Sequence, residues 1–390
     1  MDQSTILPAA PAPRYHALDG MRAAMMLLGI YLHVAVAYAT IGGWPYKQAE
    51  LTSSLNLSIV LIHLFRMPAF YMMAGFFAAL LVARWGFRAA AANRVRRIAI
   101  PFGVGWLIVY PVVVALIVIG KGWAATRASV PPGPLWTRLH PLHLWFLEYL
   151  LLLYGLAMVA VPALGALPAG WRASFERAFR AALTAGWAPL ALALPSCAAL
   201  LPMRYAGFDD PAGFIPQPHI LVAYAIPFAV GWLLYRNVDL LEVLRRRAWL
   251  HSALALAALV LYVALNYNFP NRGLPFAAKC AAHALAMWLV IFGITGLFLR
   301  HLAGPSAVWR YLCDSSYFLY IAHMPIIMAF QLLLEPVGLP PLAKIPIVLA
   351  ATTLVLLVLY RYAVRPTAIG ALLNGRRYST ASPAPLTVPA

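Results

Sequence analysis

Apolar residues along this chain occur in long runs that are separated by short polar segments. The runs are mostly about 20 residues long, the length that an α-helix needs to cross the hydrocarbon core of a bilayer. They predict ten membrane-spanning helices, at 20–41, 56–83, 98–119, 142–163, 185–203, 218–235, 248–267, 276–299, 315–335 and 342–363. Prolines interrupt the fifth and sixth runs, so these two are the weakest of the set.

The composition supports an all-α polytopic integral membrane protein. Hydrophobic residues make up 63% of the 390 residues, whereas charged residues make up only 10%. The loops between the runs are at most about 20 residues long, which is too short for an independent soluble domain. We therefore expect one transmembrane domain over 19–365, with a short N-terminal tail at 1–18 and a disordered tail at 366–390 that is rich in Pro, Ala, Ser and Thr.

The formal net charge of +18 is explained by topology. Most Lys and Arg residues fall in short loops on the side of the membrane that also holds the N-terminus, and such loops stay in the cytoplasm. Both termini are therefore expected to be cytoplasmic. The charge therefore does not indicate nucleic-acid binding, and we expect the lipid bilayer to surround the protein.

One segment after the fourth run has a different pattern. Trp171, Phe175 and Phe179 repeat every four residues, opposite several charged side chains. This amphipathic pattern predicts a short helix that lies flat on the cytoplasmic surface.

The first predicted span carries an arginine and a histidine eleven residues apart, Arg22 and His33. At about 100° and 1.5 Å per residue, both side chains face the same way, and His33 lies about 16 Å deeper. Ionisable groups are costly inside hydrocarbon and usually line a cavity or a pathway. Asp19 precedes Arg22 by one turn and can hold its guanidinium group, either for function or as a structural salt bridge at the helix entry.

Two other predicted spans carry charged groups at depth. The second span has His63 and Arg66 one turn apart, and the fourth has Glu148. An arginine at this depth needs a partner or water, and bracing of neighbouring helices is as well supported as a functional role. Glu148 is a candidate partner for Arg66 or for an imidazole.

The remaining notable histidines divide into two groups. His140 and His143 precede the fourth span and are expected at the outer surface, where a histidine is usually only an anchor. In the ninth span, helical rise places His323 about 12 Å from the cytoplasmic end, at a depth similar to that of His33.

Arg94, Arg96 and Arg97 stand at the start of the third span. Such a cluster is typical of the cytoplasmic end of a span, but guanidinium groups also suit a phosphate-bearing cytosolic cosubstrate. The same arginines can serve both purposes. The sequence thus predicts a basic cytoplasmic mouth below an inner chamber, whose polar residues are His33, His63, Arg66, Glu148 and His323.

Several kinds of chemistry find no support in the motifs. The histidines are scattered over different helices, without the spacing of a metal site, so no metal is expected. The chain has no phosphate-binding glycine loop, no dinucleotide fingerprint and no GxSxG elbow, and we expect no bound cofactor. Cys197, Cys280 and Cys313 are isolated and are interpreted as buried thiols without a redox or metal role.

Five segments in order resemble the acyltransferase 3 family of bacterial inner-membrane acyltransferases. They are LDGMR followed by His33, FRMPAFYMMAGFF, RVRRIAIP with Arg94 and Arg97, HLWFLEYLLLLYG, and SYFLYIAHMP. The resemblance extends from about Arg14 to Arg361. Two departures are visible: Ala74 precedes Gly75 where relatives often carry serine, and His323 is single where a glucan-modifying relative has two adjacent histidines.

The resemblance implies a multi-pass inner-membrane enzyme that moves a succinyl or acetyl group from cytosolic acyl-CoA, its cosubstrate, to sugar hydroxyls of an envelope glycan. Osmoregulated periplasmic glucan is the favoured acceptor, and glucan-synthesis proteins are the implied partners. His33, Arg66 and Glu148 are then the expected catalytic residues, with His33 as general base or as acyl carrier. The acyl-CoA site is expected at Arg22, Arg94, Arg96 and Arg97, with Asp19, His63 and His323 in supporting or acceptor-binding roles.

Two other functions are compatible with the same polar groups. A secondary transporter or flippase of an envelope glycan precursor also has broken helices and charges near the middle of the membrane. A scaffold subunit of a glucan-synthesis complex would tolerate the loss of His33 and Arg22. Dependence on acyl-CoA distinguishes the enzyme from both.

Overall fold

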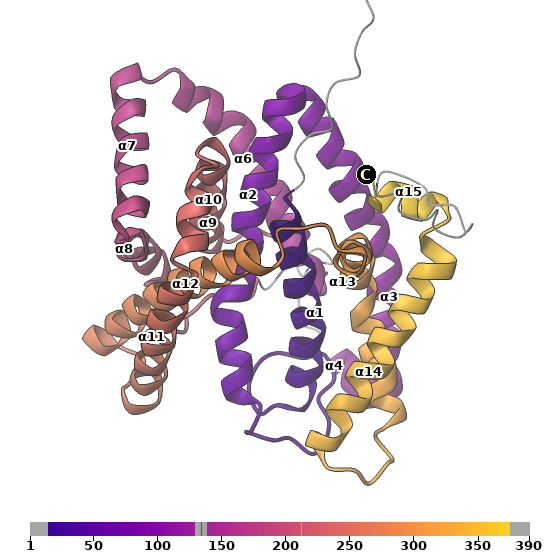
Figure 1. Cartoon of the computed structure of the whole chain (residues 1–390). Coiled ribbons are helices and arrows are strands. Elements are labelled where there is room, and N and C mark those ends of the chain that lie inside the picture. The colour runs from indigo at the N-terminus through magenta and orange to yellow at the C-terminus, as the bar shows by residue number, and fades with distance from the viewer. Residues whose placement is uncertain (1–14, 129–133, 135–138, 212, 375–390) are drawn as a thin grey trace, which may run out of the picture.

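The computed structural model describes residues 15–128, 134, 139–211 and 213–374 (Figure 1). Over these residues the chain is mostly helical and has no β-strand. A single isolated bridge pairs Ala39 with Thr52 in the loop after the first helix. This agrees with the all-α class that the apolar runs predict.

The helices follow the predicted spans in order. The first half of the chain forms α1 (His16–Tyr38), α2 (Asn56–Arg94), η1 (Val95–Ala99), α3 (Ile100–Lys121), α4 (Trp123–Ala128), η2 (Leu142–Leu144), α6 (Trp145–Gly165), α7 (Ala169–Ala185) and α8 (Ala188–Leu200). The second half forms α9 (Pro218–Arg236), α10 (Leu240–Arg246), α11 (Ala248–Asn268), α12 (Gly273–His301), α13 (Ala307–Leu333), α14 (Pro341–Leu359), η3 (Tyr360–Val364) and α15 (Ala368–Asn374).

Eight helical units among the described residues are long and apolar enough to cross a membrane. One of them, Asn56–Lys121, has 66 residues, and as a straight helix it would be about 100 Å long, more than three times the thickness of the hydrocarbon core. It is broken at Gly86, where φ is 76°, and Figure 1 shows the ribbon turning back between the labels α2 and α3. This unit therefore holds the second and third predicted spans.

The fifth predicted span is irregular. It corresponds to α8, which has only 13 residues and is bent by 118° from the preceding α7. Thirteen residues rise about 20 Å, less than the hydrocarbon thickness. This pair is a broken span or a re-entrant segment, as expected for the most proline-interrupted part of the chain.

Large apolar side chains cover the outside of the helices. Leu107, Ile119, Val159 and Leu194 are 65%, 72%, 71% and 74% exposed. A water-soluble protein rarely exposes so much aliphatic surface along consecutive helices, whereas a lipid-facing surface requires it. The chain is a multi-pass membrane protein.

Helices α1 and α2 lie in the middle of the molecule (Figure 1). Helices α7 to α11 are on one side of them, and α3, α13, α14 and α15 are on the other. α2 and α9 approach closely because Gly75 and Gly231 face the partner backbone. A Cβ atom at Gly75 would lie 1.9 Å from the Phe228 carbonyl oxygen, and one at Gly231 would lie 1.7 Å from that of Met72.

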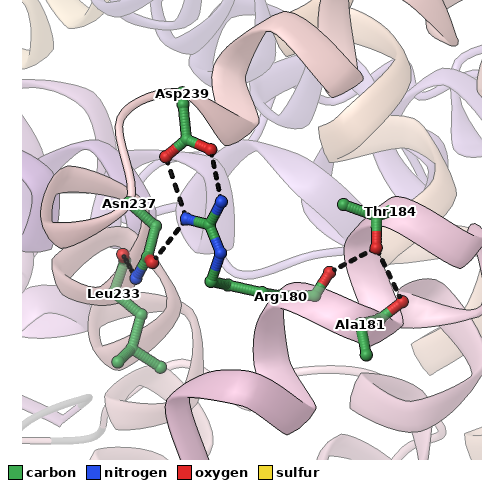
Figure 2. A network of polar contacts seen from close by, with 6 residues as sticks. All are labelled: Arg180, Ala181, Thr184, Leu233, Asn237 and Asp239. Carbon is green, nitrogen blue, oxygen red and sulfur yellow. Dashed lines mark hydrogen bonds and ion pairs between the residues drawn. The ribbon is translucent and has the colours of Figure 1, made fainter. Parts of the chain in front are cut away.

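The predicted amphipathic helix is present as α7, and its position relative to the lipid stays a prediction. Figure 2 shows how it is fastened to the turn between α9 and α10. Arg180 donates two hydrogen bonds to the Asp239 carboxylate, at 2.9 and 2.6 Å, and a third to the Asn237 side-chain oxygen at 2.9 Å. This bidentate arrangement fixes the relative orientation of α7 and α10.

The predicted tails extend beyond the described residues. Residues 1–14 and 375–390 lie outside them, and the expected disorder at 375–390 is therefore not addressed. Within the described part, the expectation of a disordered tail from residue 366 is wrong for 368–374. These residues form α15, which packs against η1 and α13.

Candidate active site

Three histidine rings from separate parts of the chain meet between α1, η2 and α13. The ring centroids of His33 and His323 are 4.8 Å apart. The ring of His143 lies 4.7 Å from that of His323 and 6.1 Å from that of His33. α1 and α13 pack along each other, so the prediction that His33 and His323 share one depth agrees with the structure.

Hydrogen bonds determine which nitrogen of each ring carries the proton. Nδ1 of His323 lies 2.7 Å from the Tyr320 carbonyl oxygen and 3.1 Å from that of Leu319. Because a carbonyl oxygen only accepts, this Nδ1 is protonated, and Nε2 of the neutral ring has a lone pair. That lone pair accepts a hydrogen bond from Nδ1 of His33 at 2.6 Å. The Nε2 atom of His33 is then an acceptor with a fixed orientation.

His143 corrects the sequence analysis. It was expected as an anchor at the outer surface, but it is buried with 8% exposure. Its Nε2 donates to the carbonyl oxygens of Tyr320 and Ile321, at 3.0 and 3.2 Å. The turn η2 begins at Leu142, which has a positive φ of 54°, and folds the chain inward just before α6. Hydropathy does not encode this turn, so the burial of His143 was not predictable from the apolar runs.

Arg66 on α2 is buried, with 7% exposure, and it has no hydrogen-bond or ion-pair partner among the described residues. Its guanidinium group lies against the backbone of α1 at Gly29, where a Cβ atom would be 2.1 Å from Nη1. His33 is four residues after Gly29 and therefore faces the same way, one turn further along. The guanidinium group thus lies beside His33, and the two interact electrostatically.

His63 lies one turn from Arg66 on α2. Its ring interacts electrostatically with Arg66 and with Asp210, a carboxylate in the loop between α8 and α9. Neither His63 nor Asp210 has a hydrogen bond to another described residue. His63 was predicted from its place in an apolar run, whereas Asp210 was not, because a loop carboxylate next to Asp209 has no distinguishing pattern.

Glu148 does not pair as the sequence predicted. It forms no hydrogen bond or ion pair with Arg66 or with any imidazole among the described residues, and its Oε2 atom is buried without a partner. The reason is the rotation of α6 about its axis. Phe146 packs against Tyr320, which borders the histidine cluster. Glu148 lies two residues further along, about 200° around the helix from Phe146.

A cavity of about 240 Å³ lies at the end of the bundle where α1 begins. Arg22, Arg94 and Arg97 line it, and residues of α15 close part of it. Arg22 donates to the Cys313 thiol at 2.8 Å and lies 3.4 Å from the Asp19 carboxylate. The predicted pairing with Asp19 is present, and Cys313, which is a buried thiol as predicted, belongs to the same group.

The predicted arginine cluster divides in two. The guanidinium group of Arg94 stacks over the Tyr154 ring at 4.9 Å, and Arg94 and Arg97 both line the cavity. Arg96 is exposed and does not line it. The expected role of Arg96 therefore has no geometric support.

Aromatic side chains separate the cavity from the histidines. Phe70 and Phe146 line the cavity, with ring centroids 5.4 Å apart. The Tyr320 ring packs 5.9 Å from Phe146 and 5.5 Å from His143. α1 runs past this partition: Arg22 and Met26 line the cavity, Gly29 contacts Arg66, and His33 joins the histidine cluster. These four positions share one helical face.

Within the part of the chain that the structure describes, no group of three or more His, Cys, Asp or Glu side chains is arranged to hold a metal ion. The polar atoms near His33 are nitrogen donors and acceptors of imidazole and guanidinium groups. This set suits proton transfer and the binding of a developing negative charge.

Fold and site together define a polytopic membrane protein with a buried histidine and arginine site above a basic cavity. The chain belongs to the acyltransferase 3 family, because the family model described as an acyltransferase domain matches residues 15–361. It is therefore a multi-pass membrane acyltransferase. Membership favours acyl transfer over the transporter, flippase and scaffold alternatives.

Curated relatives support the same family. The chain is 27% identical to the glucans biosynthesis protein C of Salmonella gallinarum, over 85% of this chain and 86% of the relative. The proteins of the same name from Salmonella paratyphi A and Salmonella dublin are 26% identical with the same coverage. No solved structure matches the chain.

Proposed function

We propose that this protein transfers a succinyl or acetyl group from cytosolic acyl-CoA to a hydroxyl group of an envelope glycan, with osmoregulated periplasmic glucan as the acceptor. The enzyme would lie in the bacterial inner membrane with both termini in the cytoplasm. The name shared by the relatives supports a glucan as the acceptor. The observation that carries the proposal is the directed lone pair of His33 beside the unpartnered guanidinium group of Arg66.

In this proposal the cavity holds the donor. Arg22, Arg94 and Arg97 supply charge-assisted hydrogen bonds to the phosphates of CoA. The pantetheine arm then follows α1 past Met26 and Gly29. The rise from Arg22 to His33 is about 16 Å, which is comparable to the length of that arm. The thioester would arrive beside Arg66 and His33.

The histidine pair supplies the base. Nε2 of His33 removes the proton of the attacking sugar hydroxyl, and the sugar oxygen forms a bond to the thioester carbonyl carbon. When the C–S bond breaks, the proton on His33 passes to the departing CoA sulfur. His323 acts through His33 as a positioning residue, because its lone pair holds Nδ1–H of His33. A covalent acyl-histidine is the variant mechanism.

Arg66 stabilises the tetrahedral intermediate. The carbonyl oxygen becomes negatively charged when the hydroxyl attacks, and a fixed cation in a water-poor site binds this charge strongly. The lack of a carboxylate partner among the described residues supports this role, since an ion pair would neutralise the guanidinium group before the reaction. Among the described residues Glu148 forms no hydrogen bond or ion pair with these groups, and it has no role in the proposed mechanism.

The test compares a deletion strain that carries the wild-type chain with strains that carry His33→Ala or the control His301→Ala. His301 lies at the exposed end of α12. Membrane abundance is matched by immunoblot, and periplasmic glucans are analysed by mass spectrometry. We expect a succinyl or acetyl mass increment with wild type and with His301→Ala, and none with His33→Ala. Equal modification in all three strains would exclude His33 as the base.

A second assay addresses the donor. Purified protein is incubated with radiolabelled succinyl-CoA or acetyl-CoA and a glucose oligosaccharide. Label in the oligosaccharide identifies the acyl group. If glucans are unmodified in the wild-type strain and neither CoA thioester donates its label, the proposed reaction is wrong.

A further inference from the structure

Two loops at the ends of helices approach the histidine cluster from the side opposite to the cavity. One follows α1 and carries Trp44, and the other joins α8 to α9 and carries Asp210. The ring centroids of Trp44 and His33 are 5.6 Å apart, with an interplanar angle of 46°. An indole ring therefore borders the imidazole that acts as the base in the proposed function.

Trp44 is rigidly held. Its Nε1 donates to the side-chain oxygen of Gln331 at 2.9 Å, and the side-chain nitrogen of Gln331 donates to the Tyr46 carbonyl oxygen at 2.7 Å. Gln331 is fully buried, and Gln48 from the same loop donates to its backbone oxygen at 3.0 Å. Most of the rotational freedom of this tryptophan is therefore lost before any ligand arrives, which favours binding against its face.

The second loop is anchored next to Asp210. Phe208 stacks on Tyr224 of α9, with ring centroids 4.7 Å apart and an interplanar angle of 10°. The Tyr262 hydroxyl donates to the Ala206 carbonyl oxygen at 3.0 Å. Asp210 itself is exposed and interacts electrostatically with His63 and with Arg66.

Arg66, His63 and Asp210 share an unusual property. They interact electrostatically, yet none of them forms a hydrogen bond with another described residue. Arg66 is more than nine-tenths buried and can only donate, whereas the Asp210 carboxylate can only accept. A hydroxyl group does both. A molecule with several hydroxyl groups can therefore satisfy the two kinds of partner at once.

The charges also restrict the ligand. Arg66 and Asp210 carry opposite charges, so neither an anionic nor a cationic molecule gains a net attraction from the pair. A sugar ring is neutral, offers hydroxyl groups around its edge, and has an apolar face of C–H groups that stacks on aromatic rings. We propose that Trp44 and Asp210 form the acceptor subsite and that it selects an uncharged sugar, which it places next to His33. This inference rests on the proposed function and adds the residues that bind the acceptor and select it by charge.

The test separates acceptor binding from donor binding. Purified wild type, Trp44→Ala, Trp44→Phe and Asp210→Asn are assayed with the labelled acyl-CoA, a neutral glucose oligosaccharide and a matching oligosaccharide that carries a uronic acid. The controls are Glu50→Gln, an exposed carboxylate in the same loop as Trp44, and Trp123→Ala, an exposed indole in α4.

We expect Trp44→Ala and Asp210→Asn each to raise the KM for the neutral oligosaccharide about 10-fold or more. Trp44→Ala removes a stacked ring, and Asp210→Asn removes a hydrogen bond to a charged group. The KM for acyl-CoA should stay within about 2-fold of the wild-type value. Trp44→Phe keeps an aromatic face and should lie between Trp44→Ala and wild type. Asp210→Asn should also reduce the preference for the neutral oligosaccharide over the uronic acid. The two control variants should match wild type.

Each other result has a definite meaning. If wild type transfers the acyl group but both variants keep its acceptor KM, the subsite is wrong and the proposed function stands. If the KM values for donor and acceptor rise together, the two residues are structural and the subsite is again wrong. If wild type transfers no acyl group to the neutral oligosaccharide, the glucan acceptor of the proposed function fails, and with it the inference.

Discussion

Arg22 and Arg66 both lie in membrane-spanning helices, but they differ in their hydrogen-bond partners and in their exposure. Arg22 has the Asp19 carboxylate at 3.4 Å and the Cys313 thiol at 2.8 Å, and 38% of its side chain is exposed to the cavity. Arg66 is 7% exposed and has no hydrogen-bond partner among the described residues. One guanidinium group is held by the fold, and the other is held in place only by packing.

The difference indicates two kinds of task. A paired guanidinium group keeps a fixed position and can share its remaining donors with a phosphate group. An unpartnered buried cation costs free energy in the resting protein, and that cost is recovered only when negative charge develops nearby. A purely bracing role for Arg66, which the sequence left open, would require hydrogen bonds to neighbouring carbonyl groups, and these are absent from the described residues.

The largest effect is expected at Arg66. Arg66→Met should lower kcat by about 10²–10³-fold, the loss typical of an oxyanion donor. The melting temperature of the purified protein should stay the same or rise, because the substitution removes a buried charge and leaves no partner unpaired. Steady-state kinetics and thermal unfolding in detergent measure both quantities. A lower melting temperature with normal kcat would show that Arg66 is a structural brace.

Arg22→Met should give the opposite profile. We expect the KM for acyl-CoA to rise about 10-fold, because a charge-assisted hydrogen bond is lost. The melting temperature should fall, because the ion pair between Arg22 and Asp19 is lost. Arg22→Lys keeps the charge and should recover most of the stability but less of the binding, since lysine has no planar fork. Unchanged stability in Arg22→Met would mean that the comparison with Arg66 fails.

The next effect distinguishes arginines that differ only in helical phase. Arg94→Gln and Arg97→Gln should each raise the KM for acyl-CoA several-fold to about 10-fold. Arg96→Gln is the matched control, because it removes the same charge from the same cluster without lining the cavity. The KM of Arg96→Gln for acyl-CoA should stay at the wild-type value. Equal effects at all three positions would indicate a general surface potential in place of a shaped phosphate site.

The sequence predicted those features that depend on one helix at a time. The spans follow from runs of apolar residues, and the common face of Arg22 and His33 follows from their spacing of eleven residues. The predicted shared depth of His33 and His323 also agrees, because depth depends only on helical rise.

Features that depend on the rotation of one helix against another were not predictable. Glu148 was expected to pair with Arg66, yet it forms no hydrogen bond or ion pair with it, because hydropathy does not determine the rotation of a helix that is apolar on all sides. His143 enters the site through a turn with a positive φ at Leu142, a local geometry without a sequence signal. The exposure of Arg96 depends in the same way on the phase of the helix.

The smallest effect is expected at an ion pair outside the site, between Arg180 and Asp239 (Figure 2). Both side chains are largely exposed, so water and salt screen their attraction. The hydrogen bonds from Arg180 hold the pKa of Asp239 below its usual value. A lowered pKa in the folded state means that the pair stabilises the protein above about pH 4, where the unfolded carboxyl group is ionised.

This stabilisation is lost as the pH falls through the folded pKa. Arg180→Met should therefore lower the melting temperature slightly at pH 7, and the difference from wild type should shrink as the pH falls below about 4, while kcat is unchanged at pH 7. Asp239→Asn should give the same small shift at pH 7, because either change breaks one shared pair. A large loss of activity in either variant would show that the orientation of α7 matters to the site. Arg180 would then be a functional residue like the arginines of the cavity. The presence or absence of a carboxylate partner would no longer separate structural arginines from functional ones.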